Sequence, residues 1–310
     1  MVEKCKYDLE RKWGKDMLNR LNVYIEEMYP IIPRFIVSLL MVAVQYFGVI
    51  AFASTQPSYH FSWADLGVVY TVFAFLFLLR IADEFKDYEK DLINYPERAL
   101  PSGRVFKKDL WVLGIVLFIS MVIMNLILPQ AISPFLLVIF YGFLMTVWFF
   151  QRDKIEPSLV LALITHNPVQ LLLSYYVIHY VCNQYELPIW TWQNVCLALT
   201  LYIPALLWEV SRKIKAPEDE NQYVTYSQVW GFKGSLQVIL AVAAIGVLFA
   251  LVLVYKQMGS FLLLFAYGGL VYAIIHYYKA PQGKNLKVAV PAYLMIHLVI
   301  FLVLVCFIYF

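Results

Sequence analysis

The chain has 310 residues, of which 62% are hydrophobic and only 15% charged, and its mean hydropathy is +0.70. A water-soluble domain is nearer half apolar and a quarter charged, so this composition excludes an ordinary soluble protein and predicts an integral, multi-pass membrane protein. The net charge of +3 is small, and no nucleic-acid partner is expected.

The first 30 residues lack the apolar core of a signal peptide. Their apolar side chains recur every three to four positions: Leu9, Trp13, Met17, Leu21, Tyr24 and Met28. This spacing predicts an amphipathic cytoplasmic segment over 1–30. It either lies on the inner membrane surface or packs as a cap on the cytoplasmic loops.

Residues 31–310 are expected to form a single catalytic membrane domain. Nine apolar stretches approach the roughly 20 residues that a crossing needs. They lie near 31–53, 63–83, 110–128, 133–150, 158–181, 192–211, 235–255, 260–278 and 288–309. Such spans must be helical, because lipid cannot satisfy an open backbone. The predicted fold class is therefore all-α and polytopic.

Lysine and arginine predict the orientation. With the N-terminus in the cytoplasm, the inner connections 84–109, 151–157, 212–234 and 279–287 are rich in both, whereas the outer connections contain only Lys256. This asymmetry follows the positive-inside rule.

Three aspartates four residues apart, Asp83, Asp87 and Asp91, end the second apolar stretch. On a helix they form a ladder along one face, with steps of about 6 Å. Like charges at this spacing repel, so the ladder is best explained by a bound cation. Mg²⁺ suits such oxygen ligands and typically shares them with substrate phosphates. The ladder therefore predicts an enzyme that handles a phosphorylated lipid at the cytoplasmic surface.

The same loop continues with Pro96, Arg98, Pro101, Gly103 and Arg104. Its prolines and glycine favour a turn over a continuous helix. The two arginines can reach back toward anionic oxygens, since a planar guanidinium suits phosphate. The alternative is an ordinary basic inner loop, but its place directly after the ladder favours diphosphate binding.

The fifth span contains His166, Asn167 and Pro168. Pro168 is expected to kink the helix. The two polar side chains at membrane depth are candidates for proton removal or for positioning an acceptor. A helix–helix hydrogen bond is the alternative.

The second long inner loop begins with Glu209 at the end of the sixth span. An ionisable group there is a candidate site residue, although a local salt bridge with Arg212 or Lys213 is the alternative. A second acidic cluster follows, formed by Glu218, Asp219 and Glu220. The cysteines lack metal-ligand spacing, and buried thiols are favoured over a Cys182–Cys196 disulfide.

One resemblance is specific. The ladder, followed by Arg98-x2-Pro101-Ser102-Gly103-Arg104, resembles the first signature of the UbiA superfamily of intramembrane prenyltransferases. The resemblance extends to the span count, both inner loops and the 225–231 stretch. It implies nine transmembrane helices around a central cavity, Mg²⁺ as cofactor and an isoprenyl diphosphate substrate. The prenyl group would pass to an aromatic or other lipophilic acceptor.

The resemblance also implies residue roles. By it, Asp87 and Asp91 would be metal ligands, and the contacts to the diphosphate would come from Arg98, Arg104, Arg152 and Lys213. The positions of the other charged residues in the two inner loops add Asp83, Glu209, Glu218 and Asp219 as expected metal ligands and Arg212 as an expected diphosphate contact. Asp83 stands where the family usually has asparagine, and the second family motif, two aspartates four apart, is replaced by Glu209 and the 218–220 cluster.

Three functions are compatible with these residues. A prenyltransferase is favoured. The alternative on the same scaffold is a terpene cyclase, in which the allylic cation is attacked by the double bonds of its own chain. An ion or lipid transporter is third, because transporters place coupling sites near the membrane midplane rather than at the ends of spans.

Overall fold

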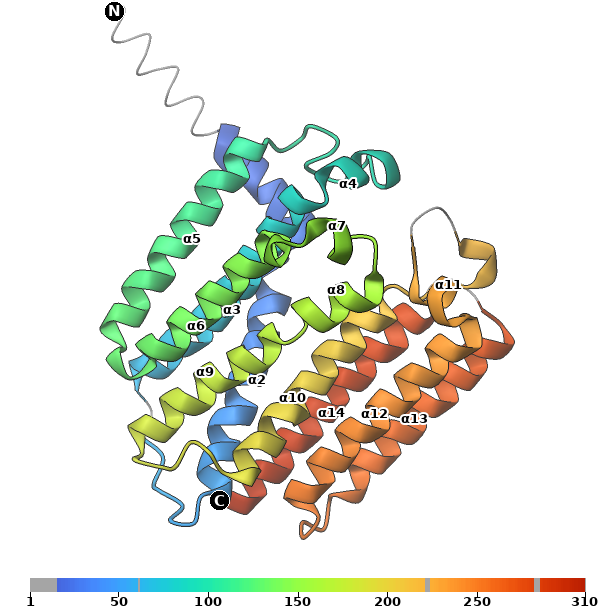
Figure 1. Ribbon diagram of the computed structural model, residues 1–310. Coiled ribbons are helices and arrows are strands. Elements are labelled where there is room, and N and C mark those ends of the chain that lie inside the picture. Colours follow the sequence, from blue (N-terminus) through green and yellow to red (C-terminus); the bar gives the residue numbers. More distant parts are fainter. Residues whose placement is uncertain (1–15, 61, 221–223, 282–284, 310) are drawn as a thin grey trace, which may run out of the picture. The chain divides into compact units, whose positions relative to one another are not determined.

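The structure is a computed structural model that describes residues 16–60, 62–220, 224–281 and 285–309. The secondary structure in these ranges is helical, and eight of the helical segments are long and apolar enough to cross a membrane (Figure 1). The predicted all-α, polytopic fold is therefore confirmed. The number of nine spans and the orientation stay predictions, and Leu9, Trp13 and Cys5 lie outside the described residues.

Backbone contacts divide the chain into two units. Unit 1 holds residues 1–39 and 63–128, and unit 2 holds residues 40–62 and 129–310. The single membrane domain expected over 31–310 stays a prediction.

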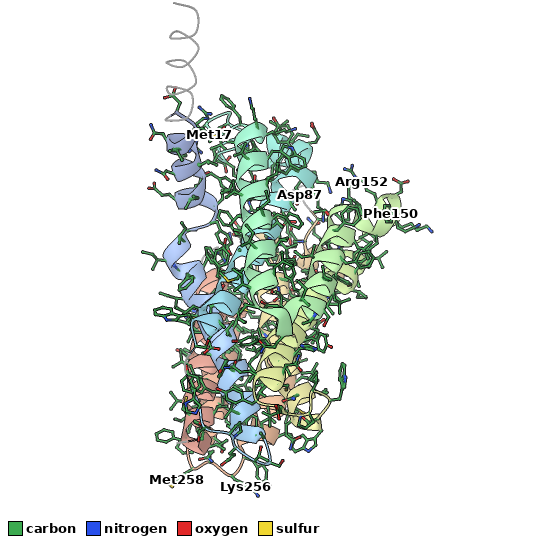
Figure 2. All side chains as sticks on the ribbon, turned by 90° about the vertical axis from the view of Figure 1, so that its left-hand side faces the viewer. Met17, Asp87, Phe150, Arg152, Lys256 and Met258 are labelled. Atoms are coloured by element: carbon green, nitrogen blue, oxygen red, sulfur yellow. The ribbon has the colours of Figure 1, made fainter. Side chains whose placement is uncertain are left out.

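Unit 1 is built on two long antiparallel helices. It contains a helix of residues 16–28, the first part of α2 (Ile31–Phe52), α3 (Trp63–Lys86), α4 (Tyr88–Asn94) and α5 (Lys107–Ile127). α3 packs along α5. Asn125 on α5 donates a buried hydrogen bond to Thr71 on α3 at 3.0 Å, which satisfies both polar groups inside the apolar contact. Met17 and Asp87 lie toward the same end of this unit (Figure 2).

Unit 2 holds the remaining helices. These are the rest of α2, η1 (Pro129–Ala131), α6 (Ile132–Thr146), η2 (Trp148–Phe150), α7 (Arg152–Ile155), α8 (Leu159–His166), α9 (Val169–Gln184), α10 (Trp192–Ser211), η3 (Pro217–Asp219), α11 (Tyr226–Trp230), α12 (Phe232–Val254), α13 (Phe261–Lys279) and α14 (Asn285–Tyr309). Lys256 and Met258 lie at one end of the unit, and Phe150 and Arg152 lie at the other (Figure 2).

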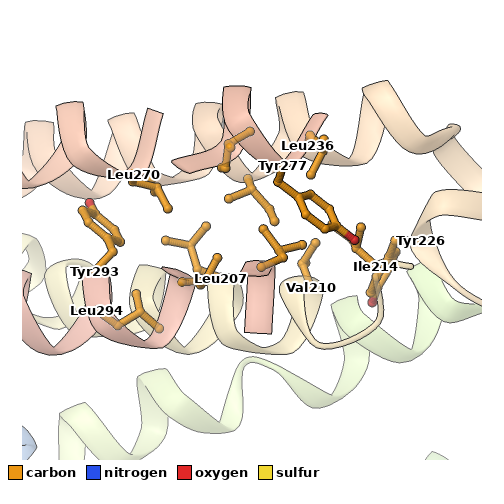
Figure 3. Packing of buried hydrophobic residues seen from close by; sticks show 14 of the residues in the cluster. Leu207, Val210, Ile214, Tyr226, Leu236, Leu270, Tyr277, Tyr293 and Leu294 are labelled. Carbon is orange, nitrogen blue, oxygen red and sulfur yellow. The ribbon is translucent and has the colours of Figure 1, made fainter. Parts of the chain in front are cut away.

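The core of unit 2 lies among α10, α12, α13 and α14. Leu207, Leu236, Leu270 and Leu294, one from each helix, belong to one buried cluster (Figure 3). Tyr226 from α11 lies at the edge of the cluster, near the last turn of α10 and the first turn of α12 (Figure 3). Lipid tails are as apolar as leucine, so close van der Waals packing between these membrane helices, and not removal from water, stabilises this cluster.

Two predicted spans differ from the observed helices. The span expected over 133–150 ends at Thr146, because the next residues form a left-handed turn. Trp148, Phe149 and Phe150 have φ of 53°, 50° and 57°. Nothing in the local sequence predicts this, since left-handed backbone is unfavourable for bulky residues. The kink expected at Pro168 is confirmed, because α8 ends at His166 and α9 begins at Val169.

α10 and α12 approach closely at Gly246. A Cβ added there would lie 2.7 Å from Cγ2 of Ile203, a β-branched side chain that has little freedom to move. We expect Gly246→Ala to lower the free energy of unfolding by about 1–3 kcal/mol through overpacking. Gly268→Ala on α13 is the matched control, because its Cβ would meet nothing within 4 Å. Thermal unfolding in detergent compares the two, and equal melting temperatures would contradict this account.

Candidate functional site

The aspartate ladder lies where α3 passes into α4. α3 ends at Lys86, α4 begins at Tyr88, and Asp87 between them has φ −100° and ψ 5°. The backbone N–H of Asp87 donates to the carbonyl of Asp83 at 2.9 Å, and that of Asp91 to the carbonyl of Asp87 at 2.8 Å. Helical hydrogen bonding thus continues through the bend, so the three aspartates keep a common face.

Two arginines pair with carboxylates at this point. The Asp91 side chain accepts a bond from Nη1 of Arg98 at 2.8 Å and is largely buried. Glu84, which is only 2% exposed, pairs with Arg80 one turn earlier on α3. Glu84 was not among the predicted site residues, because it lies off the face that the three aspartates share. The sequence does indicate its pairing with Arg80, because the i, i+4 spacing of the two residues is typical of a salt bridge along one helix face.

Residues 95–106, here called the arginine loop, connect α4 to α5. The guanidinium of Arg98 lies 3.8 Å from the centre of the Tyr95 ring, in a cation–π contact. Gly103 has φ +75°, a backbone conformation that glycine adopts without strain. The turn predicted from the prolines and glycine is confirmed. Arg104 donates to the carbonyl of Glu97 at 2.6 Å and pairs with Glu27 at 2.7 Å.

The helix of residues 16–28 packs against the rest of unit 1. Leu21 and Tyr24 are buried, whereas Leu18 is exposed, and the amphipathic cytoplasmic segment expected over 1–30 stays a prediction. The hydroxyl of Tyr24 is buried and has no hydrogen-bond partner among the described residues. Burial, together with the nearby Glu84 carboxylate, raises the pKa of Tyr24 above its usual value. Tyr24 therefore stays neutral beside the ladder.

Glu209 is held by two cations of its own segment. Its Oε2 lies 2.6 Å from Nε of Arg212, and its Oε1 lies 3.0 Å from Nζ of Lys213. This is the local salt bridge that the sequence left open as an alternative. Glu218 and Asp219 lie on η3 with exposed side chains, whereas Glu220 accepts a bond from Oγ1 of Thr225 at 2.8 Å.

His166 ends α8 within an aromatic cluster. Its ring lies 5.2 Å from the Trp148 ring and 5.7 Å from the Phe149 ring, so the left-handed turn is packed against it. Its Nδ1 lies 3.1 Å from the carbonyl of Ala162, four residues earlier in the same helix. The neighbouring Asn167 is 8% exposed, and its Oδ1 has no hydrogen-bond partner among the described residues.

Arg152 lies on α7 and forms an i, i+4 pair with Glu156 at 2.7 Å, with its side chain 60% exposed. Cys182, Cys196 and Cys306 are free thiols, and of these Cys182 is buried whereas the other two are half-buried, so the prediction of buried thiols is confirmed for Cys182 alone.

The ladder fits Mg²⁺ by the chemistry of its donors. Within the described ranges, no three His, Cys, Asp or Glu side chains gather into a preformed metal cage. Mg²⁺ does not require one, because it commonly takes one or two carboxylates and completes its octahedral shell with phosphate and water. Asp83 and Asp87, one helical turn apart, offer hard oxygen ligands of this kind.

The chain is similar to known proteins over most of its length. Residues 40–308 match the UbiA prenyltransferase family. A solved structure described as digeranylgeranylglyceryl phosphate synthase is 16% identical with a TM-score of 0.57, over 93% of this chain and 99% of that one. A UbiA homologue from Aeropyrum pernix K1 is 13% identical with a TM-score of 0.58, over 87% and 96%. The search of curated proteins found no match.

Proposed function

Because the chain belongs to the UbiA prenyltransferase family, we propose that it is a Mg²⁺-dependent enzyme that ionises an isoprenyl diphosphate and transfers the prenyl group to a lipophilic acceptor. The acceptor is proposed to be aromatic, and the mouth of the active site to face the cytoplasm. The chain is an integral membrane protein of this family, which supports a lipid substrate taken from the bilayer.

The observation that carries the proposal is the common face of Asp83, Asp87 and Asp91 with Arg98 bound to its last member. Carboxylates without a metal ion would repel the negatively charged diphosphate. An arginine without carboxylates would bind the diphosphate but would not bind Mg²⁺. Together they suit a diphosphate whose charge is shared between Mg²⁺ and a guanidinium. Structural salt bridges do not require three acidic groups at regular helical spacing.

In the proposed reaction the bond between C1 of the prenyl chain and the diphosphate oxygen breaks, and the diphosphate leaves with the electron pair. The acceptor then forms a bond to C1 and loses a proton. Bound Mg²⁺ would supply charge neutralisation on the leaving diphosphate. Asp83 and Asp87 would hold the ion, and Arg98 would orient the diphosphate.

Unit 2 supplies further proposed contacts. Arg212 and Lys213, held by Glu209, are candidates for the diphosphate, as is the exposed Arg152. Glu218 and Asp219 are proposed ligands of a further Mg²⁺, because their exposed carboxylates are open to an ion. Glu209 is proposed to position its two cations, since both of its oxygens are engaged.

His166 and Asn167 are proposed to act on the acceptor. An imidazole can serve as a general base that takes the proton of the acceptor. The aromatic rings of Trp148 and Phe149 beside it suit a cationic intermediate. Asn167, which is 8% exposed, is a candidate to orient the acceptor through its amide oxygen.

The test uses purified protein in detergent with Mg²⁺ and geranyl, farnesyl or geranylgeranyl diphosphate. Release of pyrophosphate and products by gas chromatography–mass spectrometry are followed with and without an aromatic acceptor. Turnover only with the acceptor supports the prenyltransferase. Cyclic hydrocarbons or alcohols without an acceptor would establish a terpene cyclase instead, and no consumption under either condition would favour a transporter.

Arg98→Gln separates metal binding from diphosphate binding. The guanidinium occupies the Asp91 carboxylate at 2.8 Å, so it competes with a cation for that side chain. We expect the variant to bind Mn²⁺, a spectroscopic probe for Mg²⁺, more tightly in the absence of substrate. The KM for the prenyl diphosphate should rise about 10- to 100-fold, the range for loss of a charge-assisted bond.

Electron paramagnetic resonance of Mn²⁺ measures the first effect, and steady-state kinetics measure the second. Lys90→Gln removes one positive charge from an exposed position on α4, next to Asp91, and is the charge-matched control. Weaker Mn²⁺ binding by Arg98→Gln than by this control would contradict competition at Asp91.

A further inference from the structure

The helix of residues 16–28 contacts the rest of unit 1 through one face. Arg20, Tyr24 and Glu27 lie four and three residues apart, a spacing that stacks side chains above one another on a helix. Tyr24 is fully buried, and its ring stacks on that of Phe77 in α3. Arg20 and Glu27 bind the start of α5 and the arginine loop.

Glu27 binds the middle of the arginine loop in two ways. Its Oε1 accepts a hydrogen bond from the backbone N–H of Ala99 at 2.9 Å. Its Oε2 lies 2.7 Å from Nη2 of Arg104. The same guanidinium donates to the carbonyl of Glu97 and, through Nε, to Oγ of Ser102 at 3.0 Å. The Nε and Nη2 atoms of Arg104 are therefore engaged by the loop and by Glu27.

Arg20 binds the end of the loop. Its Nε and Nη2 donate to the two carboxylate oxygens of Asp109 at 2.7 and 2.9 Å. Asp109 also accepts a bond from the backbone N–H of Phe106, the last residue of the loop, at 3.1 Å. The guanidinium lies 4.7 Å from the centre of the Phe106 ring. One helix thus fixes the loop at residue 99 and at residue 106.

Arg98 lies directly before the first fixed point. Ala99 and Leu100 are buried, so the backbone that directly follows Arg98 is fixed by packing. The Arg98 guanidinium itself contacts Tyr95 and Asp91. We propose that Glu27 is a positioning residue that holds Arg98 in place for the diphosphate, and that Arg104 braces the loop instead of binding substrate. The inference rests on the proposed function.

Three variants test the role. Glu27→Ala removes both contacts, Glu27→Gln keeps an oxygen that can accept from Ala99, and Glu26→Ala is the control, because Glu26 is an exposed neighbour on the same helix. Alanine and glutamine are both good helix formers, so the helix is retained. Hydrogen exchange of the peptide over 95–106 is measured first, without substrate, and steady-state kinetics follow.

We expect exchange over 95–106 to quicken about 10-fold in Glu27→Ala, about threefold in Glu27→Gln, and not in the control, in line with loss of hydrogen bonds to a charged group. The KM for the prenyl diphosphate should rise about fivefold to 10-fold in Glu27→Ala, with kcat within about twofold, because the loop positions a binding group and not the reacting atoms.

Unchanged hydrogen exchange over 95–106 in Glu27→Ala would show that Glu27 does not fix the arginine loop, whatever the enzyme's substrate. Faster exchange with an unchanged KM would overturn the positioning role. If the unaltered protein turns over no prenyl diphosphate although exchange responds as expected, the proposed function fails, and the role that rests on it fails with it.

Discussion

Replacement of Asp87 by asparagine is expected to lower prenyl diphosphate turnover by about 10²–10³-fold, the scale on which loss of one preorganised electrostatic contact slows an enzyme. Asp87 is the central member of the ladder, with Asp83 one turn before it and Asp91 one turn after. An amide of the same shape keeps the packing but removes the charge that binds the ion. Pyrophosphate release under saturating Mg²⁺ measures the loss.

The fold should tolerate this change. Asp87 precedes the first turn of α4, yet its side chain makes no capping hydrogen bond there, so the melting temperature should stay within about 2 °C, as for a surface substitution that removes no bond. Glu89→Gln, an exposed position on the same helix, is the charge-matched control. If turnover by Asp87→Asn lies within threefold of that control, the ladder does not take part in the reaction.

The second large effect concerns stability. Arg20→Met should lower the free energy of unfolding by about 3–5 kcal/mol, because it leaves the Asp109 carboxylate buried without its cation. The Asp109 side chain is fully buried and accepts two bonds from this guanidinium. Methionine keeps the apolar stem of arginine, so lost packing contributes little. Thermal unfolding in detergent, with far-ultraviolet circular dichroism, measures the change.

A double-mutant cycle isolates the pair. Asp109→Leu removes the buried charge, so Arg20→Met in that background should cost no more than about 1 kcal/mol. The double variant should accordingly be more stable than Arg20→Met alone. Strictly additive losses would show that the two side chains do not depend on each other, contrary to the bidentate contact.

The membrane helices could be predicted because hydropathy depends on sequence alone. Lipid requires long apolar helices wherever the chain crosses it, so apolar runs and helices coincide. α2, α10 and α12 lie within about three residues of their predicted ends. The ladder and the turn after it could be predicted for the same reason, since both depend on residues close in the sequence.

Contacts between distant residues could not be predicted. Glu27 reaches Ala99, 72 residues later, and Arg20 reaches Asp109, 89 residues later. No spacing in the sequence relates such pairs. The left-handed turn at Trp148 likewise packs against His166, which lies in another helix. Glu209 was ambiguous, because the same spacing to Arg212 and Lys213 suits a salt bridge and a substrate site.

The contact between the helix of residues 16–28 and the arginine loop has a practical consequence for anyone who works with trimmed chains. The family match begins at residue 40, so a chain cut to the matched boundaries would still be recognised as a relative. It would lack Arg20 and Glu27, and it would carry a buried aspartate without its counter-charge and a loop released at two points. Such a chain would keep its match to the family, whereas it would lose the contacts that hold the arginine loop next to the ladder.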